Sequence, residues 1–373
     1  MRALFLPCIN GNPGAMTHYD LLLIGAGHAH LGVLRRWARL ERPPGRIALL
    51  SAGHEAWYSG MLPGLLAGRY AAADCQIELA PLCRAAKVEL IVGQAEALSA
   101  VQQQLHLADG RGLNADWLSL NVGGQVACPP QTGAGMQVLA VKPFADFLAG
   151  WQRWQADPQP VAILGGGAAG VELALALADQ VPQLALFCRG PLLSGHAGGL
   201  RLRALGHLRR RGVRVREDCP ISRIDEDCLI SGEAPVWRGQ RLLLASGAQA
   251  VPWLAQSGLG CDTDGFVRIA ATLQSHSHPH IFAVGDCASL PGARKSGVYS
   301  VRQAPVLAAN LNAALRGLPL RDYRAQRQSL ALLATGDGGA LLSWRHCSAG
   351  GQLFGRWKDY LDRGFIQRHR LSG

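Results

Sequence analysis

The stretch PVAILGGGAAGVELALALA, from Pro160 to Ala178, decides the fold that this sequence predicts. Five residues predict a buried strand, the next six form a complete Gly-x-Gly-x-x-Gly turn, and the apolar run from Val171 to Ala178 predicts a helix. Glycines in such a turn let the backbone approach a ligand closely, and the helix N-terminus offers free N–H groups to a pyrophosphate. The residues expected to contact a dinucleotide here are Gly165, Gly167, Ala168, Ala169 and Gly170.

A similar arrangement lies about 140 residues earlier. A strand is predicted over Tyr19 to Ile24, a helix over Leu31 to Leu40 and another strand over Arg46 to Leu50. His30 replaces the third glycine of this turn, and no acidic residue follows the second strand directly, so the segment alone leaves an ordinary βα turn as the alternative. Two glycine-rich turns in one chain favour two bound dinucleotides. The residues expected at the first turn are Gly25, Ala26, Gly27, His28, Ala29, His30 and Ser51.

A third signature is IFAVGD, from Ile281 to Asp286, an apolar strand that ends in Gly-Asp before a helix predicted over Gly297 to Leu315. An Asp in this place can accept a hydrogen bond from the ribityl chain of a flavin, while the helix N-terminus faces the flavin pyrimidine. A plain helix cap is the alternative. Two further strands end in small-residue loops where we expect the chain to cross between domains. The residues added to the cofactor site are Gly123, Gly247, Gly285, Asp286, Gly297 and Val298.

Composition limits the class of protein. With 373 residues, 49% of them hydrophobic and 17% charged, the chain is predicted to form two or three globular domains and not a disordered or fibrous chain. A net charge of +11 favours phosphates, an anionic membrane surface or nucleic acid as partners, but no aromatic residues are interleaved with the basic ones, so we expect no nucleic acid. The ten cysteines lack zinc-type spacing, which predicts reduced thiols in the cytoplasm and no metal site.

These motifs predict an α/β chain with two Rossmann-like dinucleotide-binding domains and a small C-terminal α+β segment. Met16 stands directly before the first strand and is an alternative start. The expected parts are a disordered leader over 1–16, a discontinuous FAD-binding domain over 17–145 and 262–318, an NAD(P)H-binding domain over 146–261, and a C-terminal segment over 319–373.

The order of these motifs resembles that of the pyridine nucleotide-disulfide oxidoreductase superfamily, and the resemblance covers Tyr19 to Leu315. Within it, YSGMLPG (Tyr58 to Gly64) and KSGVYSVRQ (Lys295 to Gln303) resemble the type II NADH dehydrogenase-like branch. The chain is most similar to the flavoprotein module that is sometimes fused ahead of selenide, water dikinase. The resemblance implies hydride transfer from the nicotinamide of NAD(P)H to N5 of FAD, and then reduction of a quinone or another small acceptor.

Cysteine positions separate this chain from two relatives of that superfamily. The segment from Trp57 to Tyr70 corresponds to the helix that carries the redox pair in disulfide reductases, and it contains no Cys. Sulfide:quinone oxidoreductases need cysteines near the flavin, and only a convergence of Cys128 and Cys347 leaves that alternative open. The other alternative is a redox-responsive flavoprotein that binds a partner in selenium metabolism.

The resemblance also implies two catalytic residues. Glu172, after the second turn, corresponds to an acid near the nicotinamide and the flavin edge with a positioning or proton-relay role, and its alternative is a first-turn Glu favoured by the helix dipole. Lys142 resembles a recurring basic residue of the branch, with a solvated linker Lys as the alternative. Arg189 stands where an NADH site usually has an acid, so it can pair with a 2′-phosphate and we expect NADPH to be tolerated.

The C-terminal segment has apolar residues at helical spacing from Leu353 to Phe365, with basic residues around them. This pattern fits an interfacial helix on an anionic membrane, which would place a cytoplasmic protein on the inner face of the membrane beside a lipid-soluble quinone. It fits equally a helix that docks on the FAD-binding domain with a basic outer face.

Overall fold

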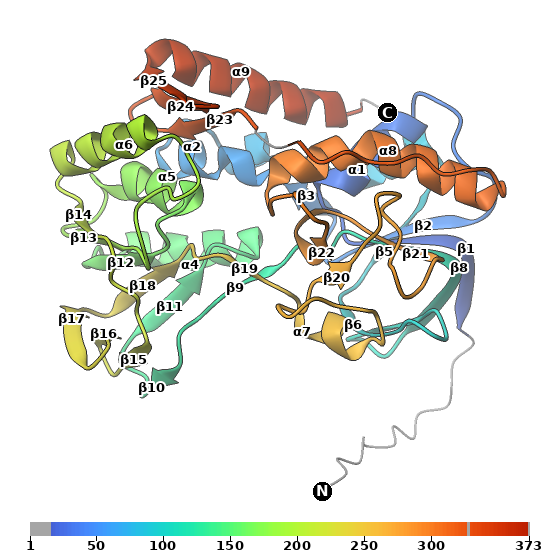
Figure 1. The fold of residues 1–373 in the computed structure, drawn as a ribbon, viewed down its shortest axis with the longest axis horizontal. Coiled ribbons are helices and arrows are strands. Elements are labelled where there is room, and N and C mark those ends of the chain that lie inside the picture. Colours follow the sequence, from blue (N-terminus) through green and yellow to red (C-terminus); the bar gives the residue numbers. More distant parts are fainter. Residues whose placement is uncertain (1–15, 327–328, 372–373) are drawn as a thin grey trace, which may run out of the picture.

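The structure is a computed structural model that describes residues 16–326 and 329–371 (Figure 1). The predicted leader therefore lies outside the described residues, apart from Met16. No helix within the described ranges is long and apolar enough to cross a membrane.

The first described strand, β1, belongs to a seven-stranded sheet. Its strands follow the order β5-β2-β1-β8-β7-β6, and β21 pairs with β8. The members are β1 (Thr17–Ile24), β2 (Ile47–Ser51), β5 (Glu89–Val92), β6 (Ala95–Ser99), β7 (Gln104–Leu107), β8 (Gly112–Leu120) and β21 (Ile281–Ala283). The central strands β1, β2 and β8 run parallel and bury apolar runs, as strands covered on both faces do. Its helices are α1 (His28–Trp37), α3 (Leu79–Ala86) and α8 (Gly297–Leu315).

A second, five-stranded parallel sheet has the order β11-β18-β12-β13-β14 and its own hydrophobic core. Its strands are β11 (Gln137–Ala140), β12 (Val161–Leu164), β13 (Leu184–Phe187), β14 (Arg214–Arg216) and β18 (Arg241–Leu244), and its helices are α4 (Phe144–Gln155), α5 (Ala168–Leu177) and α6 (Gly198–Arg210). A small sheet of β10 (Gln131–Thr132), β15 (Arg223–Asp225), β16 (Cys228–Ser231) and β17 (Ala234–Arg238) lies beside it. The predicted α/β architecture is confirmed.

Two crossings join these sheets. The short strands β9 (Gln125–Val126) and β19 (Ala248–Gln249) pair antiparallel, so the two linker segments lie side by side. Each follows one of the small-residue loops that the sequence predicted at a crossing, at Gly123 and Gly247.

The C-terminal segment forms an antiparallel sheet and one long helix across the top of both halves in Figure 1. It consists of β23 (Ala331–Ala334), β24 (Ala340–Trp344), β25 (Cys347–Gly351) and α9 (Gln352–His369). Gly355 lets α9 cross the turn between β23 and β24, because a Cβ there would overlap with the carbonyl of Gly338. The inner side of α9 buries Phe365 and Ile366, so the helix docks on the rest of the protein.

Candidate functional site

The first glycine-rich turn joins β1 to α1 and needs glycine at two positions. Gly25 has a φ of +91°, and a Cβ there would lie 2.6 Å from the backbone oxygen of Asn121. A Cβ at Gly27 would overlap with the Asn121 side chain. The sequence therefore folds here into a bend that only glycine can make.

Asn121, directly after β8, caps helix α1 and was missed by the sequence analysis. Its Oδ1 accepts hydrogen bonds from the N–H groups of Ala29 (3.0 Å) and His30 (3.2 Å). The three preceding N–H groups, from Ala26 to His28, donate to no acceptor in the described chain. Unpartnered N–H groups at a helix N-terminus suit a phosphate, so the turn fits the pyrophosphate of a dinucleotide.

His30 lies beneath this turn with its side chain fully buried. Its Nδ1 lies 2.6 Å from the carbonyl oxygen of Gly25, and its Nε2 lies 2.8 Å from Oγ of Ser119. Burial lowers the pKa of His30 to about 4, so the ring is neutral near pH 7. The close contact of α1 with a neighbouring helix is made by Gly32 and not by residue 30, because a Cβ at Gly32 would lie 2.5 Å from Cβ of Ala304 on α8.

Asp286 and Lys142, predicted separately for the cofactor site and for catalysis, lie together. Lys142 Nζ donates a 2.8 Å hydrogen bond to Oδ2 of Asp286, whose side chain is only 15% exposed. Within the described chain, Oδ1 of Asp286 has no hydrogen-bond partner. The carboxylate can therefore accept a further hydroxyl donor while it still holds Lys142.

The remaining residues predicted for the first site surround the same turn. Helix α8 begins at Gly297, and a Cβ there would lie 3.8 Å from Nε2 of His28. Val298 is 39% exposed on the first turn of α8. Ser51 ends β2 and is buried, while Gly123 takes a φ of +73° in the loop after β8.

The second glycine-rich turn joins β12 to α5 and follows the same geometry. A Cβ at Gly165 would overlap with the backbone oxygen of Ala245, and a Cβ at Gly170 would overlap with the carbonyl of Gly165. The N–H groups from Gly167 to Ala169 donate to no acceptor in the part of the chain that the structure describes. This turn also fits a pyrophosphate.

Arg189 lies beyond the end of β13, beside this second turn, and is exposed. It forms no ion pair or side-chain hydrogen bond with any described residue. Gly247, also predicted for the cofactor site, lies after β18 with open space at the position of a Cβ.

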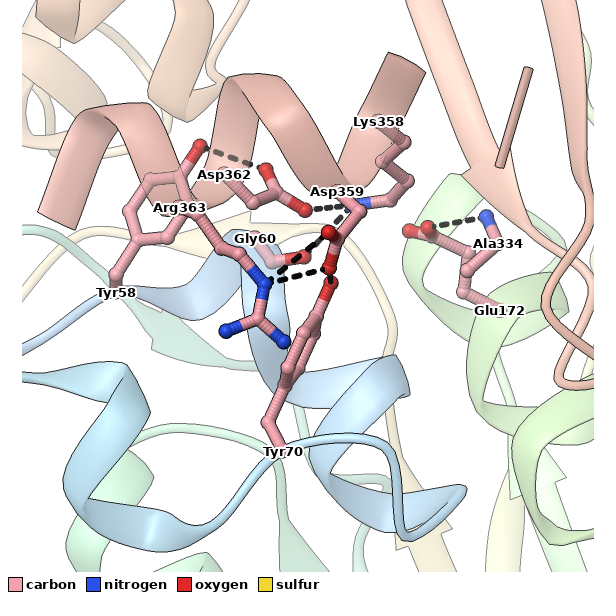
Figure 2. Close-up of polar contacts among 9 residues, drawn as sticks. All are labelled: Tyr58, Gly60, Tyr70, Glu172, Ala334, Lys358, Asp359, Asp362 and Arg363. Atoms are coloured by element: carbon pink, nitrogen blue, oxygen red, sulfur yellow. Dashed lines mark hydrogen bonds and ion pairs between the residues drawn. The ribbon is translucent and has the colours of Figure 1, made fainter. Parts of the chain in front are cut away.

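Glu172 lies on α5 and faces the C-terminal segment (Figure 2). Its Oε1 accepts a 2.7 Å hydrogen bond from the N–H group of Ala334 at the end of β23. Burial raises the pKa of Glu172 to about 7, against the opposing effects of the Lys358 ammonium and the Ala334 N–H group. The carboxyl can thus hold or release a proton near neutral pH.

A buried ion pair on α9 lies next to Glu172 in Figure 2 and was not predicted. Lys358 Nζ donates to Oδ2 of Asp362 (2.7 Å) and to the backbone oxygen of Gly60 (2.8 Å). The hydroxyl of Tyr58 donates to the other oxygen of Asp362 at 3.2 Å. The two charged side chains are 12% and 8% exposed. Burial alone would lower the pKa of Lys358, but Glu172 and Asp362 outweigh it and raise that pKa.

A small cleft lies beside this ion pair, between α2 (Leu62–Leu66), the β23–β24 turn and α9. Glycines from α2, the β23–β24 turn and α9 are among its lining residues, together with Lys358 and Asp362. Tyr70 also lines the cleft, with its hydroxyl bonded to Oδ1 of Asp359 at 2.7 Å. A small molecule that enters the cleft would meet the Lys358 ammonium, the Arg69 guanidinium and two carboxyl groups.

An aromatic stack joins α9 to the first glycine-rich turn. The rings of Tyr58 and Phe365 stack with centroids 4.3 Å apart, and His28 lies 5.4 Å from Tyr58. Phe365 in turn packs against His369 at 4.2 Å. The C-terminal helix therefore closes one side of the first dinucleotide turn.

The nine cysteines in the described ranges are free thiols. Cys128 lies between β9 and β10, and Cys347 begins β25; these elements are far apart in Figure 1. The convergence that a sulfide:quinone oxidoreductase would need is therefore absent from the described chain. The described residues also contain no cluster of three metal-ligating side chains.

Two sheets with parallel central strands, each with a glycine-rich turn open to a pyrophosphate, define a flavoprotein that binds two dinucleotides. The chain belongs to the pyridine nucleotide-disulphide oxidoreductase family, whose sequence pattern matches residues 19–309. The predicted superfamily and its NADH dehydrogenase-like branch are confirmed, and the protein is an oxidoreductase with FAD and NAD(P)H as cofactors. The link to selenide, water dikinase stays a prediction.

Similar proteins include demethylphylloquinone reductase NdbB of Synechocystis, 28% identical over 69% of this chain and 68% of that protein. The NADH dehydrogenase-like protein YutJ of Bacillus subtilis is 25% identical over 73% of this chain and 78% of YutJ. Among solved structures, the sulfide:quinone oxidoreductase of Aquifex aeolicus superposes with a TM-score of 0.77 at 18% identity, covering 95% of this chain and 91% of that one. That likeness shows the fold alone.

Proposed function

We propose that the protein oxidises NAD(P)H with FAD bound at the first glycine-rich turn, and then reduces a quinone or a similar small acceptor. The observation that carries this proposal is the pair of glycine-rich turns with open N–H groups, one on each of the two large sheets. FAD supplies the two-electron carrier between nicotinamide and acceptor. The chain's own residues then bind the cofactors, orient the reacting groups and supply protons.

Asp286 and the N-terminus of α8 are proposed to hold the flavin. The free Oδ1 of Asp286 is suited to a ribityl hydroxyl, and its other oxygen keeps the Lys142 ammonium nearby. The N-terminus of α8 at Gly297 offers partial positive charge to the pyrimidine end of the ring system.

Glu172 is proposed to supply a proton to the acceptor. Reduction of a quinone to a quinol takes two electrons and two protons, whereas a hydride carries two electrons and one proton. The second proton must come from the protein or from water. Glu172 has a pKa of about 7 and lies beside Lys358, which lines the cleft, so it can donate that proton near neutral pH.

The exposed side of α9 is proposed to touch a membrane surface, which would give access to a lipid-soluble quinone. Leu353 and Tyr360 are 75% and 74% exposed, and Trp357 and Leu361 are also exposed on this helix. Exposed apolar residues next to arginines are typical of interfacial helices. Sedimentation with anionic liposomes tests this part separately from catalysis.

Anaerobic stopped-flow mixing tests the proposed reaction. The FAD-loaded protein is mixed first with NADH or NADPH and then with a water-soluble quinone. We expect the nucleotide to bleach the flavin absorbance and the quinone to restore it. A flavin that reduces but is not reoxidised by quinones would favour the alternative of a partner-binding redox sensor, and a flavin that neither nucleotide reduces would refute the proposal.

A further inference from the structure

The two glycine-rich turns are built alike but supported differently. In each, the backbone oxygen that follows a central strand lies against the first glycine: Asn121 against Gly25, and Ala245 against Gly165. In the first turn the residue after the strand is Asn121, and its side chain caps α1 by accepting hydrogen bonds from two backbone N–H groups. In the second turn, Ala245 has no side chain that could do so.

The third position of the motif differs as well. In the second turn Gly170 packs directly on the carbonyl of Gly165. In the first turn the His30 imidazole bonds to the carbonyl of Gly25. Because a carbonyl oxygen only accepts, Nδ1 of His30 must carry the proton, and Nε2 then accepts from the Ser119 hydroxyl. Both ring nitrogens are satisfied and the side chain is fully buried.

The same buried network reaches the strand end that precedes Asp286. Nδ2 of Asn121 donates a 3.0 Å hydrogen bond to the carbonyl of Val284, and the N–H group of Gly285 donates to Oε1 of Gln303 at 2.7 Å. Gln303 lies on α8 and is 3% exposed. The network therefore ties together the turn, the Gly-Asp strand end and α8.

We propose that His30 and Asn121 are positioning residues that hold the first turn in its dinucleotide-binding shape before FAD arrives. A site that is ordered in advance does not lose binding free energy to ordering, so it retains its ligand longer. The second turn lacks these side chains, which suits a nucleotide that exchanges in each turnover. The inference rests on the proposed assignment of FAD to the first turn.

The test measures FAD release from variants of the full chain. His30→Leu removes the hydrogen bonds to Gly25 and Ser119, and Asn121→Ala removes the cap of α1 and the bond to Val284. We expect each variant to raise the dissociation constant and the dissociation rate of FAD about tenfold, because each loses at least two hydrogen bonds of buried groups. His30→Asn keeps an N–H donor at the same distance along the side chain and is expected to stay within about threefold of wild type. Recovery of flavin fluorescence after dilution gives both constants.

A purely structural role would lower the unfolding temperature of the apoprotein without this selective effect. We therefore expect the NAD(P)H dissociation constant of the FAD-saturated variants to match wild type. Equal FAD release from wild type and both variants, or weakened NAD(P)H binding with unchanged FAD release, would overturn the inference. Wild type that takes up no FAD would overturn the proposed function instead. Should His30→Leu not fold, Ser119→Ala makes the same test with a smaller expected change of about threefold.

Discussion

Glu172→Gln is expected to slow flavin reoxidation by a quinone about 100-fold, a typical loss for a general acid, and to leave flavin reduction by NAD(P)H unchanged. The amide keeps an oxygen that can accept the hydrogen bond of the Ala334 N–H group, so the geometry around β23 is preserved. Only the transferable proton is lost. In wild type, the reoxidation rate should fall as pH rises through the pKa of about 7, because ionised Glu172 has no proton to give.

Stopped-flow reoxidation of pre-reduced protein, measured at pH values on both sides of that pKa, gives the profile. The variant should show a flat profile over this range. Asp179→Asn is a matched control near the end of the same helix, because the Asp179 side chain is 74% exposed and pairs with Arg211. A Glu172→Gln variant that keeps the wild-type rate and profile would refute the proton-supply role.

The same substitution gives a stability signature with a defined sign. Burial raises the pKa of Glu172 from 4.5 to about 7, so the folded protein binds this proton more tightly than the unfolded chain. Wild type therefore loses up to about 3 kcal/mol of unfolding free energy as pH rises between those two values. Glu172→Gln avoids this loss. Denaturant unfolding should show a difference from wild type that grows with pH, and a constant difference would contradict burial as the cause.

Three further predictions follow from single side chains. Arg189→Glu should raise the efficiency of NADH relative to NADPH about tenfold or more in steady-state assays, and an unchanged ratio would remove Arg189 from the 2′-phosphate site. Asp362→Asn removes the carboxylate that is hydrogen-bonded to the buried Lys358 ammonium and should lower the unfolding free energy by about 3 kcal/mol, measured by urea denaturation; a loss below about 1 kcal/mol would show that Glu172 and the Gly60 carbonyl suffice to hold the ammonium. Leu353→Ser should weaken sedimentation with anionic liposomes while activity with a water-soluble quinone stays at the wild-type level; unchanged sedimentation would exclude this face of α9 from membrane contact.

Much of the fold could be predicted because its signals are local. Each glycine-rich turn lies between a strand and a helix within about 20 residues, and helix α8 has the predicted bounds, Gly297 to Leu315. His30 was noticed as a departure from the motif, but its hydrogen bond to Ser119 joins residues 89 positions apart, which spacing cannot show.

The candidate site was predicted less completely, because its chemistry depends on tertiary contacts. Lys358 and Asp362 are four residues apart on one helix, a pairing that spacing could have suggested. Their burial against Tyr58, 304 positions from Asp362, could not be read from spacing. The sequence predicts that the C-terminal helix docks or lies on a membrane; the helix docks through Phe365 and Ile366 and leaves Leu353 exposed.

The stack of Phe365 on Tyr58 beside His28 has a consequence for biosynthesis. Helix α9 leaves the ribosome after both sheets have been translated, yet it closes one side of the glycine-rich turn that is translated first. A nascent chain would therefore carry an incomplete pocket until α9 has been translated, and the prosthetic group should become firmly held only after that point.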